Sequence, residues 1–162
     1  MRSKKEIVKK LGPLFESTRE VELAYLFGSA ACERPTPISD VDVAVYLNDK
    51  IDLSAHWRLR VRLIGQVMDT LGTDSVDLVI LNECPILLRH EVLKNGVLLY
   101  CQHPGKRIEF VTNTIREYCD TSHLRDFHMK AAKERLSTGA KRGSTRSFTQ
   151  SLERVRRLFD ET

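Results

Sequence analysis

The sequence predicts an α/β fold, of the α+β kind, in which a small β-sheet of about four strands is flanked by helices. Four short apolar runs alternate with segments whose apolar residues recur at helical spacing. The 162 residues, of which 41% are hydrophobic and 30% charged, are enough for one domain with a buried core. No apolar run approaches the roughly 20 residues of a membrane span, so no membrane contact is expected.

The N-terminal part of the chain predicts a helix followed by a strand. Apolar residues at helical spacing predict a helix over 4–16. Alternation that turns into an apolar run predicts the first strand over 21–27. A short helix is then expected from Ser29 to about Glu33, followed by a loop at the two prolines of 34–37.

The middle of the chain predicts a second strand and a longer helix. The strand is expected over 41–47. Asp52 or Ser54 is suited to capping the helix that follows, and Gly72 is suited to ending it. Intervals of three and four predict an apolar stripe that faces the core, with Trp57 among the core residues. The stripe comprises Trp57, Val61, Ile64, Met68 and Leu71.

Residues 76–81 predict the third strand, and their apolar character on both faces indicates a buried central strand. Asp77 is the exception in this run. A buried lone carboxylate is costly unless it is paired or metal-bound, so Asp77 is interpreted as a member of an acidic cluster. The alternative is that Asp77 marks a partly exposed strand start.

The C-terminal part predicts a helix over 84–94, a short strand over 97–101 and a long helix over 104–136. The long helix has an apolar stripe whose phase shifts near Asp120-Thr121. The stripe begins with Ile108, Val111, Ile115 and Cys119. We expect one domain over 1–136 and a basic tail over 137–162, which either makes weak contact with nucleic acid or an acidic partner, or is a solvated end.

One stretch carries the chemistry. Gly28 allows a sharp backbone turn, and Ser29 adds a hydroxyl where a helix N-terminus can present N–H groups to a phosphate. Ten residues later come Asp40 and Asp42, which project from the same face of a strand. Two adjacent carboxylates repel each other, and a divalent cation relieves that repulsion. The pattern predicts metal-assisted nucleotide chemistry.

The cysteines indicate the compartment. The four of them are scattered, with no Cys-x-x-Cys pair, and no secretory signal is visible in the charged N-terminal residues. This usage is typical of reduced thiols, so a cytoplasmic protein is expected.

The spacing of Gly28-Ser29, Asp40-x-Asp42 and Asp77 resembles the nucleotidyltransferase superfamily that includes DNA polymerase beta. The short form is similar to the minimal nucleotidyltransferase (MNT) proteins, which are often antitoxins paired with HEPN-domain RNase toxins. The segments 87–100 and 118–125 also resemble the corresponding MNT segments. One departure is that many MNT proteins have Ala-Arg-Gly where this chain has Ala31-Cys32-Glu33.

The resemblance implies a polymerase beta palm-like fold with a mixed sheet and a long C-terminal helix. It implies that Gly28 and Ser29 hold the triphosphate of ATP, and that Asp40, Asp42 and Asp77 bind Mg²⁺ and are catalytic. The implied reaction is transfer of AMP to a tyrosine hydroxyl of a cognate HEPN toxin, which inactivates the toxin. Two alternatives stay open: an antitoxin that blocks the toxin by contact only, and a nucleotidyltransferase acting on a small molecule or an RNA end.

Overall fold

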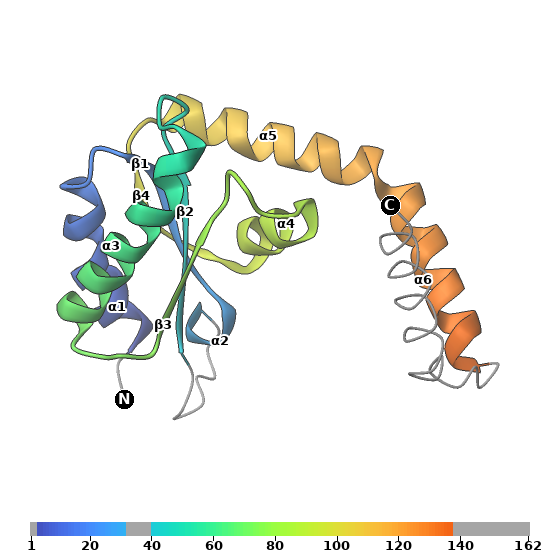
Figure 1. Cartoon of the computed structure of the whole chain (residues 1–162), viewed down its shortest axis with the longest axis horizontal. Coiled ribbons are helices and arrows are strands. Elements are labelled where there is room, and N and C mark those ends of the chain that lie inside the picture. Colours follow the sequence, from blue (N-terminus) through green and yellow to red (C-terminus); the bar gives the residue numbers. More distant parts are fainter. Residues whose placement is uncertain (1–2, 32–39, 138–162) are drawn as a thin grey trace, which may run out of the picture. The chain divides into compact units, whose positions relative to one another are not determined.

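The computed structural model describes residues 3–31 and 40–137, and the chain divides into two compact units, Met1–Asp120 and Thr121–Thr162. The described part of the second unit is one helix, α6 (Ser122–Ser137). The first unit contains, in chain order, α1 (Lys4–Glu16), β1 (Val21–Phe27), α2 (Gly28–Ala31), β2 (Val41–Leu47), α3 (Leu53–Leu71), β3 (Val76–Ile80), α4 (Ile86–Asn95), β4 (Val97–Cys101) and α5 (Pro104–Asp120) (Figure 1).

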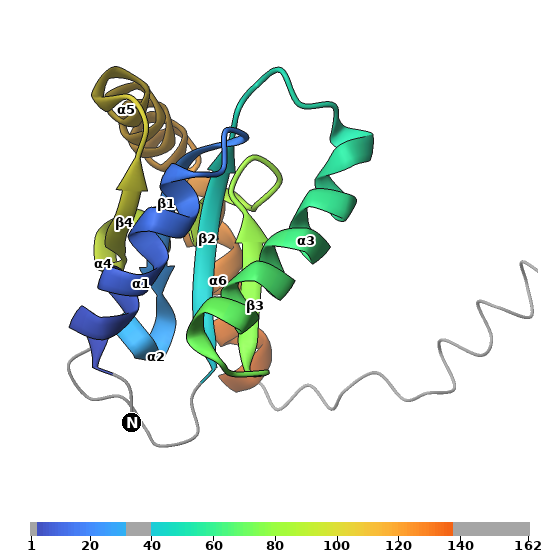
Figure 2. The ribbon, with the colours of Figure 1, turned by 90° about the vertical axis from the view of Figure 1, so that its left-hand side faces the viewer.

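The four strands form one mixed sheet in the order β3-β2-β1-β4 (Figure 2). β1 is antiparallel to β2 and to β4, whereas β2 and β3 are parallel. The predicted small mixed sheet of four strands flanked by helices is therefore confirmed. The predicted central position of the third strand is wrong, because β3 lies at the edge of the sheet. Its apolar character on both faces arises because packed side chains cover both faces even at this edge.

Helices α1 and α3 cover one face of the sheet (Figure 1). Their buried side chains, such as Leu11, Phe15 and Leu63, join strand residues such as Val43 and Leu78 in the larger hydrophobic cluster. Each strand contributes alternate side chains to this cluster, as expected for a sheet that is buried on both faces. The larger cluster fixes the positions of the strands that carry the predicted site.

The opposite face of the sheet is covered by α4 and α5 (Figure 1). Val92 of α4 and Phe110 of α5 pack there against Leu23, Tyr25 and Ala44. The rings of Tyr46 and Phe110 lie with their centroids 4.5 Å apart.

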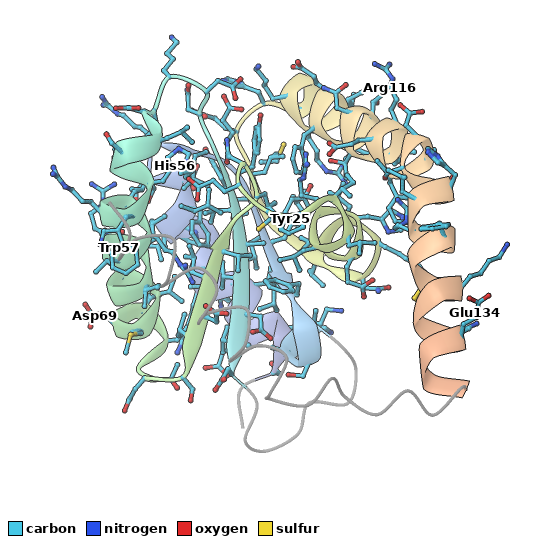
Figure 3. All side chains as sticks on the ribbon, turned by 45° about the vertical axis from the view of Figure 1, so that its right-hand side comes forward. Tyr25, His56, Trp57, Asp69, Arg116 and Glu134 are labelled. Carbon is cyan, nitrogen blue, oxygen red and sulfur yellow. The ribbon has the colours of Figure 1, made fainter. Side chains whose placement is uncertain are left out.

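The predicted apolar stripe of α3 is confirmed at Ile64, which packs against the larger cluster, and at the buried Leu71, but it is wrong in its first half, where Val61 is 49% exposed. Trp57 is 69% exposed and projects away from the sheet, so its assignment to the core is also wrong (Figure 3). The buried side of α3 consists of His56, Leu59, Leu63, Val67 and Leu71. The helix carries two adjacent apolar stripes. Its packing against β3 and α1 buries the stripe that contains Leu59 and Leu63, which was not the one predicted.

The cap predictions are confirmed in part. Gly72 ends α3 in the left-handed conformation, with φ 61°, and its N–H donates to the carbonyl oxygen of Met68 at 2.7 Å. Asp52 occupies the N-cap position, but its side chain makes no cap hydrogen bond and accepts instead from the hydroxyl of Ser54 at 2.7 Å. The start of α3 therefore depends on backbone geometry more than on a side-chain cap.

The predicted helix over 104–136 is confirmed in its extent but not in its continuity, because α5 ends at Asp120 and α6 begins at Ser122. The break coincides with the phase shift in the sequence. The predicted stripe of α5 is also wrong: Ile108 is 67% exposed, whereas Phe110 and Thr114 are buried. Residues 32–39, with the predicted loop and the Cys32-Glu33 departure, and residues 138–162 of the basic tail lie outside the described residues. No helix in the described ranges has the length and apolar character needed to cross a membrane.

Candidate active site

The five residues predicted for the site lie at one end of the sheet. Gly28 and Ser29 follow the last residue of β1 and begin α2. Asp42 and Asp77 are the second residues of β2 and β3, and the exposed Asp40 directly precedes β2. The fold thus brings together residues that are far apart in the sequence, from Gly28 to Asp77.

The strand register sets Asp42 and Asp77 side by side. They are partners in the parallel pair β2–β3, and Asp42 is also the partner of Phe27 in the antiparallel pair β1–β2. Register partners project from the same face of a sheet. By alternation this is the face of Tyr46 and Val79, which α4 and α5 cover. The two carboxylates therefore occupy neighbouring strands on one face, next to Gly28.

Gly28 is required at its position by a close approach to Asp42. Its φ is 66°, in the region that L side chains rarely adopt, and a Cβ atom there would lie 2.0 Å from Oδ2 of Asp42. No other residue leaves room for that carboxylate. The turn at the end of β1 and the position of Asp42 are therefore coupled.

Electrostatic repulsion is present among the three carboxylates. Burial raises the pKa of Asp42 above its usual value, and the negative charges of Asp77 and Asp40 raise it further. Carboxylate oxygens are the ligands that Mg²⁺ prefers in proteins. A divalent cation beside Asp42 would offset the repulsion, so the donor set fits the metal that the resemblance implies.

The three carboxylates do not converge on one point in this arrangement. Within residues 3–31 and 40–137, no three His, Cys, Asp or Glu side chains are grouped closely enough to hold a metal ion. Asp77 instead forms an ion pair with Arg60 of α3, with 3.3 Å between Oδ1 and Nη2, and its side chain is 57% exposed. The structure thus places Asp42 and Asp77 on one face without closing them around a common ligand.

Arg60 is the residue at this site that the sequence reading did not identify. It belongs to a run of alternating arginines on α3, of which Arg62 pairs with Glu20 at 2.6 Å. The spacing of the arginines does not predict which of them pairs with Asp77, because that depends on how α3 packs against β3. Its guanidinium reaches Asp77 from the helix that covers the other face of the sheet, past the free edge of β3.

Comparison with known families agrees with this geometry. The sequence model of the family described as "Polymerase beta, Nucleotidyltransferase" matches residues 9–104, more than half of the chain, and this range contains all five predicted site residues. No curated protein matches the sequence significantly.

Several solved structures have a similar fold. A tri-AMPylated HEPN toxin in complex with an MNT antitoxin, from Shewanella oneidensis, matches with 24% identity over 80% of this chain and 98% of that chain, with a TM-score of 0.61. A toxin–antitoxin structure with AMP-PNP matches with 26% identity over 82% of this chain and 99% of that chain, also with a TM-score of 0.61. A mutant MntA–HpeT toxin–antitoxin structure matches with 26% identity, 82% and 99% coverage, and a TM-score of 0.61.

The four-stranded mixed sheet, the glycine-serine turn and the aspartates on neighbouring strands form the nucleotidyltransferase fold, and its structural neighbours are MNT antitoxins in complex with HEPN toxins. The family match begins within α1 and covers every strand of this arrangement through β4. The chain belongs to the polymerase beta nucleotidyltransferase family.

Proposed function

We propose that this protein is a cytoplasmic, Mg²⁺-dependent antitoxin that transfers AMP from ATP to a tyrosine hydroxyl of a cognate HEPN toxin and so inactivates it. The observation that carries the proposal is the register that places Asp42 and Asp77 side by side, next to the turn at Gly28. The similar solved structures add support, because one contains an AMPylated HEPN toxin and another contains AMP-PNP.

Each site residue has a role in this proposal. Gly28 and Ser29 receive the triphosphate, since they follow β1 directly and Gly28 is exposed. Asp40, Asp42 and Asp77 hold Mg²⁺, which when bound neutralises the charge of the phosphates during transfer. Asp77 is the more exposed of the two strand carboxylates and is suited to accept the proton of the attacking hydroxyl.

The transfer step is an in-line displacement at the α-phosphorus of ATP. The bond from the tyrosine oxygen to that phosphorus forms, and the bond from the phosphorus to the bridging oxygen breaks. Pyrophosphate leaves, and the hydroxyl proton passes to a carboxylate. No oxidant or reductant is required, and the chain's own task is to position the reactants.

The experiment uses the full-length chain, a HEPN protein encoded beside it, Mg²⁺ and ATP labelled at the α-phosphate. We expect label on the toxin and loss of its RNase activity. Asp42→Asn and Asp77→Asn should each abolish labelling. Asp69→Asn is the matched control, because Asp69 projects from α3 into solvent (Figure 3) and its variant should label the toxin as the wild type does.

A second candidate is an antitoxin that neutralises the toxin by contact alone. It is favoured by one observation: Asp77 is paired with Arg60, and the carboxylates are not grouped around a common point within the described ranges. The same variants separate the two candidates. If Asp42→Asn and Asp77→Asn still neutralise the toxin in cells as well as the wild type does, contact alone is sufficient and the transfer proposal is rejected.

A further inference from the structure

A cavity of about 340 Å³ lies in the first unit, between α4, α5 and the strands β1 and β4. Its volume is within the range of small-molecule sites. Residues from four elements line it, among them Tyr25, Lys94, Leu98, Arg107, Val111 and Ile115. The five residues of the candidate active site are not among those lining it, so the cavity needs its own explanation.

The cavity wall carries positive charge without a counter-charge. Lys94 and Arg107 line it together with His90, and no acidic residue in the described part of the chain does. Neither Lys94 nor Arg107 forms an ion pair with a carboxylate of the described residues. Two unpaired cations at one cavity indicate that it is suited to an anion.

Tyr25 places an unused hydroxyl at the same cavity. The side chain is 3% exposed, and its buried hydroxyl has no hydrogen-bond partner among the described residues. Burial raises the pKa of Tyr25, and the nearby Arg107 guanidinium opposes that rise without reaching hydrogen-bonding geometry. A buried polar group without a partner is costly, so a ligand that accepts from this hydroxyl would remove a cost already present in the free protein.

The remaining walls are apolar and firmly placed. Leu98, Val111 and Ile115 present aliphatic surface to the cavity. The ring of His90 stacks on Tyr118 of α5 at 3.7 Å between centroids and 9° between planes, which holds this side of the wall in position. An inorganic anion would leave the aliphatic surface unused. The combination therefore favours a ligand with an anionic end and a flat, largely apolar body.

The cavity lies on the same face of the sheet as the carboxylates. Tyr25 is two residues before Phe27 on β1, so the two side chains share a face, and Phe27 is the register partner of Asp42. A ligand in this cavity would lie on the face where nucleotide chemistry is proposed. Along β1, a single residue separates Tyr25 from Phe27, the register partner of Asp42.

We propose that this cavity binds a nucleoside monophosphate unit, with the phosphate at Lys94 and Arg107, the Tyr25 hydroxyl donating to the ligand, and the base against Leu98, Val111 and Ile115. The choice of nucleotide rests on the proposed function, which makes AMP the group that is transferred. The unit can come from free AMP or from AMP already attached to an acceptor tyrosine. A nucleotidyltransferase that adds more than one AMP would use such a site to hold the previous product.

The first test measures binding of AMP, phosphate and adenosine to the full-length protein without Mg²⁺. We expect saturable AMP binding that exceeds the binding of phosphate or adenosine. Lys94→Gln combined with Arg107→Gln should weaken AMP binding at least about tenfold, because two charge-assisted hydrogen bonds are lost. Arg58→Gln combined with Arg62→Gln removes the same charge from α3 and should change AMP binding less than about twofold.

Three outcomes would overturn the proposal: no saturable AMP binding by the wild type, equal weakening by both double variants, or phosphate binding as tightly as AMP. Asp69→Asn, at an exposed position of α3, should leave this Mg²⁺-free binding unchanged. AMP binding without Mg²⁺ tests the cavity, whereas transfer of label to the toxin tests the proposed function, so the two proposals can be rejected separately. An adenylylated tyrosine peptide that competes with AMP more strongly than AMP itself identifies attached AMP as the ligand, and weaker competition identifies free AMP.

The second test uses Tyr25→Phe, which keeps the ring and removes only the hydroxyl. The unfolding midpoint of the free protein should rise, because a buried group without a partner is removed. The affinity for AMP should fall by roughly three- to tenfold, because one hydrogen bond to the ligand is lost. A purely structural tyrosine gives the opposite result: a lower midpoint with unchanged AMP affinity contradicts the proposal.

Discussion

The Asp42 carboxylate fills the space that a side chain on Gly28 would need: a Cβ atom on Gly28 would lie 2.0 Å from the Oδ2 atom of Asp42. The glycine has φ 66°, so its backbone is also in a conformation that other residues rarely adopt. The turn that ends β1 and the position of the Asp42 carboxylate near the start of β2 therefore depend on each other. Any side chain at position 28 disturbs both.

Gly28→Ala should lower the rate of AMP transfer by roughly a hundredfold, because a displacement of about 1 Å in a reacting group has that effect. The free energy of unfolding should fall by about 1–3 kcal/mol through backbone strain. Single-turnover transfer of labelled AMP and urea unfolding measure the two effects.

Gly65→Ala is the matched control, because it makes the same change inside α3, where a Cβ atom would meet nothing within 4 Å. It should leave transfer unchanged and stabilise the protein by about 0.5–1 kcal/mol, since alanine is the better helix former. Equal effects of the two substitutions would show that the contact with Asp42 is unimportant.

Arg60→Gln should strengthen divalent-cation binding by roughly two- to fivefold, because the ion pair that competes for Asp77 is exposed and worth only about 0.2–1 kcal/mol. Titration calorimetry with Mn²⁺ measures this without any turnover. Arg62→Gln removes the same charge from α3 but releases Glu20 instead. If the two variants bind Mn²⁺ equally, the effect is one of net charge and Arg60 has no special relation to Asp77.

Asp42→Asn should stabilise the metal-free protein at pH 7. The pKa of Asp42 is raised above its usual 3.8, so the folded chain binds this proton more tightly than the unfolded chain. Stability therefore falls as the pH rises from about 3.8 through the raised pKa, and the variant escapes that loss. Unfolding midpoints from pH 3 to pH 7 should differ most at pH 7 and converge at the acid end.

The control for this measurement is addition of Mg²⁺ and a non-hydrolysable ATP analogue, which should raise the midpoint of the wild type more than that of the variant. A variant that is less stable than the wild type at pH 7 without Mg²⁺ would mean that Asp42 has a favourable partner. That result would remove the electrostatic argument for a cation at this position.

Trp57→Gln and Leu63→Ala test which face of α3 is buried. Trp57 is 69% exposed, so its replacement should change the free energy of unfolding by less than about 0.5 kcal/mol. Leu63 is fully buried, and its truncation should cost about 2–5 kcal/mol. Urea unfolding of both variants decides the matter, and a larger loss for Trp57→Gln would restore the stripe that the spacing argument predicted.

Local signals in the sequence were sufficient to predict where most elements lie. The bounds of α1, β1, β2 and β4 agree with the expected ranges, because each has a clear apolar period and a turn signal at its ends. The positions of Asp42 and Asp77 on one face also follow from the motif. These features depend on residues that are close in sequence or on strands that must pair.

The features that failed depend on tertiary packing. α3 has two apolar stripes, and only contact with β3 and α1 determines that Leu63 faces the core and Trp57 does not. The edge position of β3 could not be predicted from its apolar sequence, because both faces of this strand are covered. The pairing of Arg60 with Asp77 could not be predicted for the same reason, since it requires α3 to be placed beside the edge of the sheet.

The central claim is that Asp42 and Asp77 hold a divalent cation on one face of the sheet. Anomalous diffraction from a crystal of the protein with Mn²⁺ and a non-hydrolysable ATP analogue tests it most directly. We predict a Mn²⁺ peak bonded to carboxylate oxygens of both residues at roughly 2.1 Å, with Arg60 released from Asp77. A bound nucleotide with no Mn²⁺ at these carboxylates, or with Mn²⁺ held elsewhere, would contradict the claim.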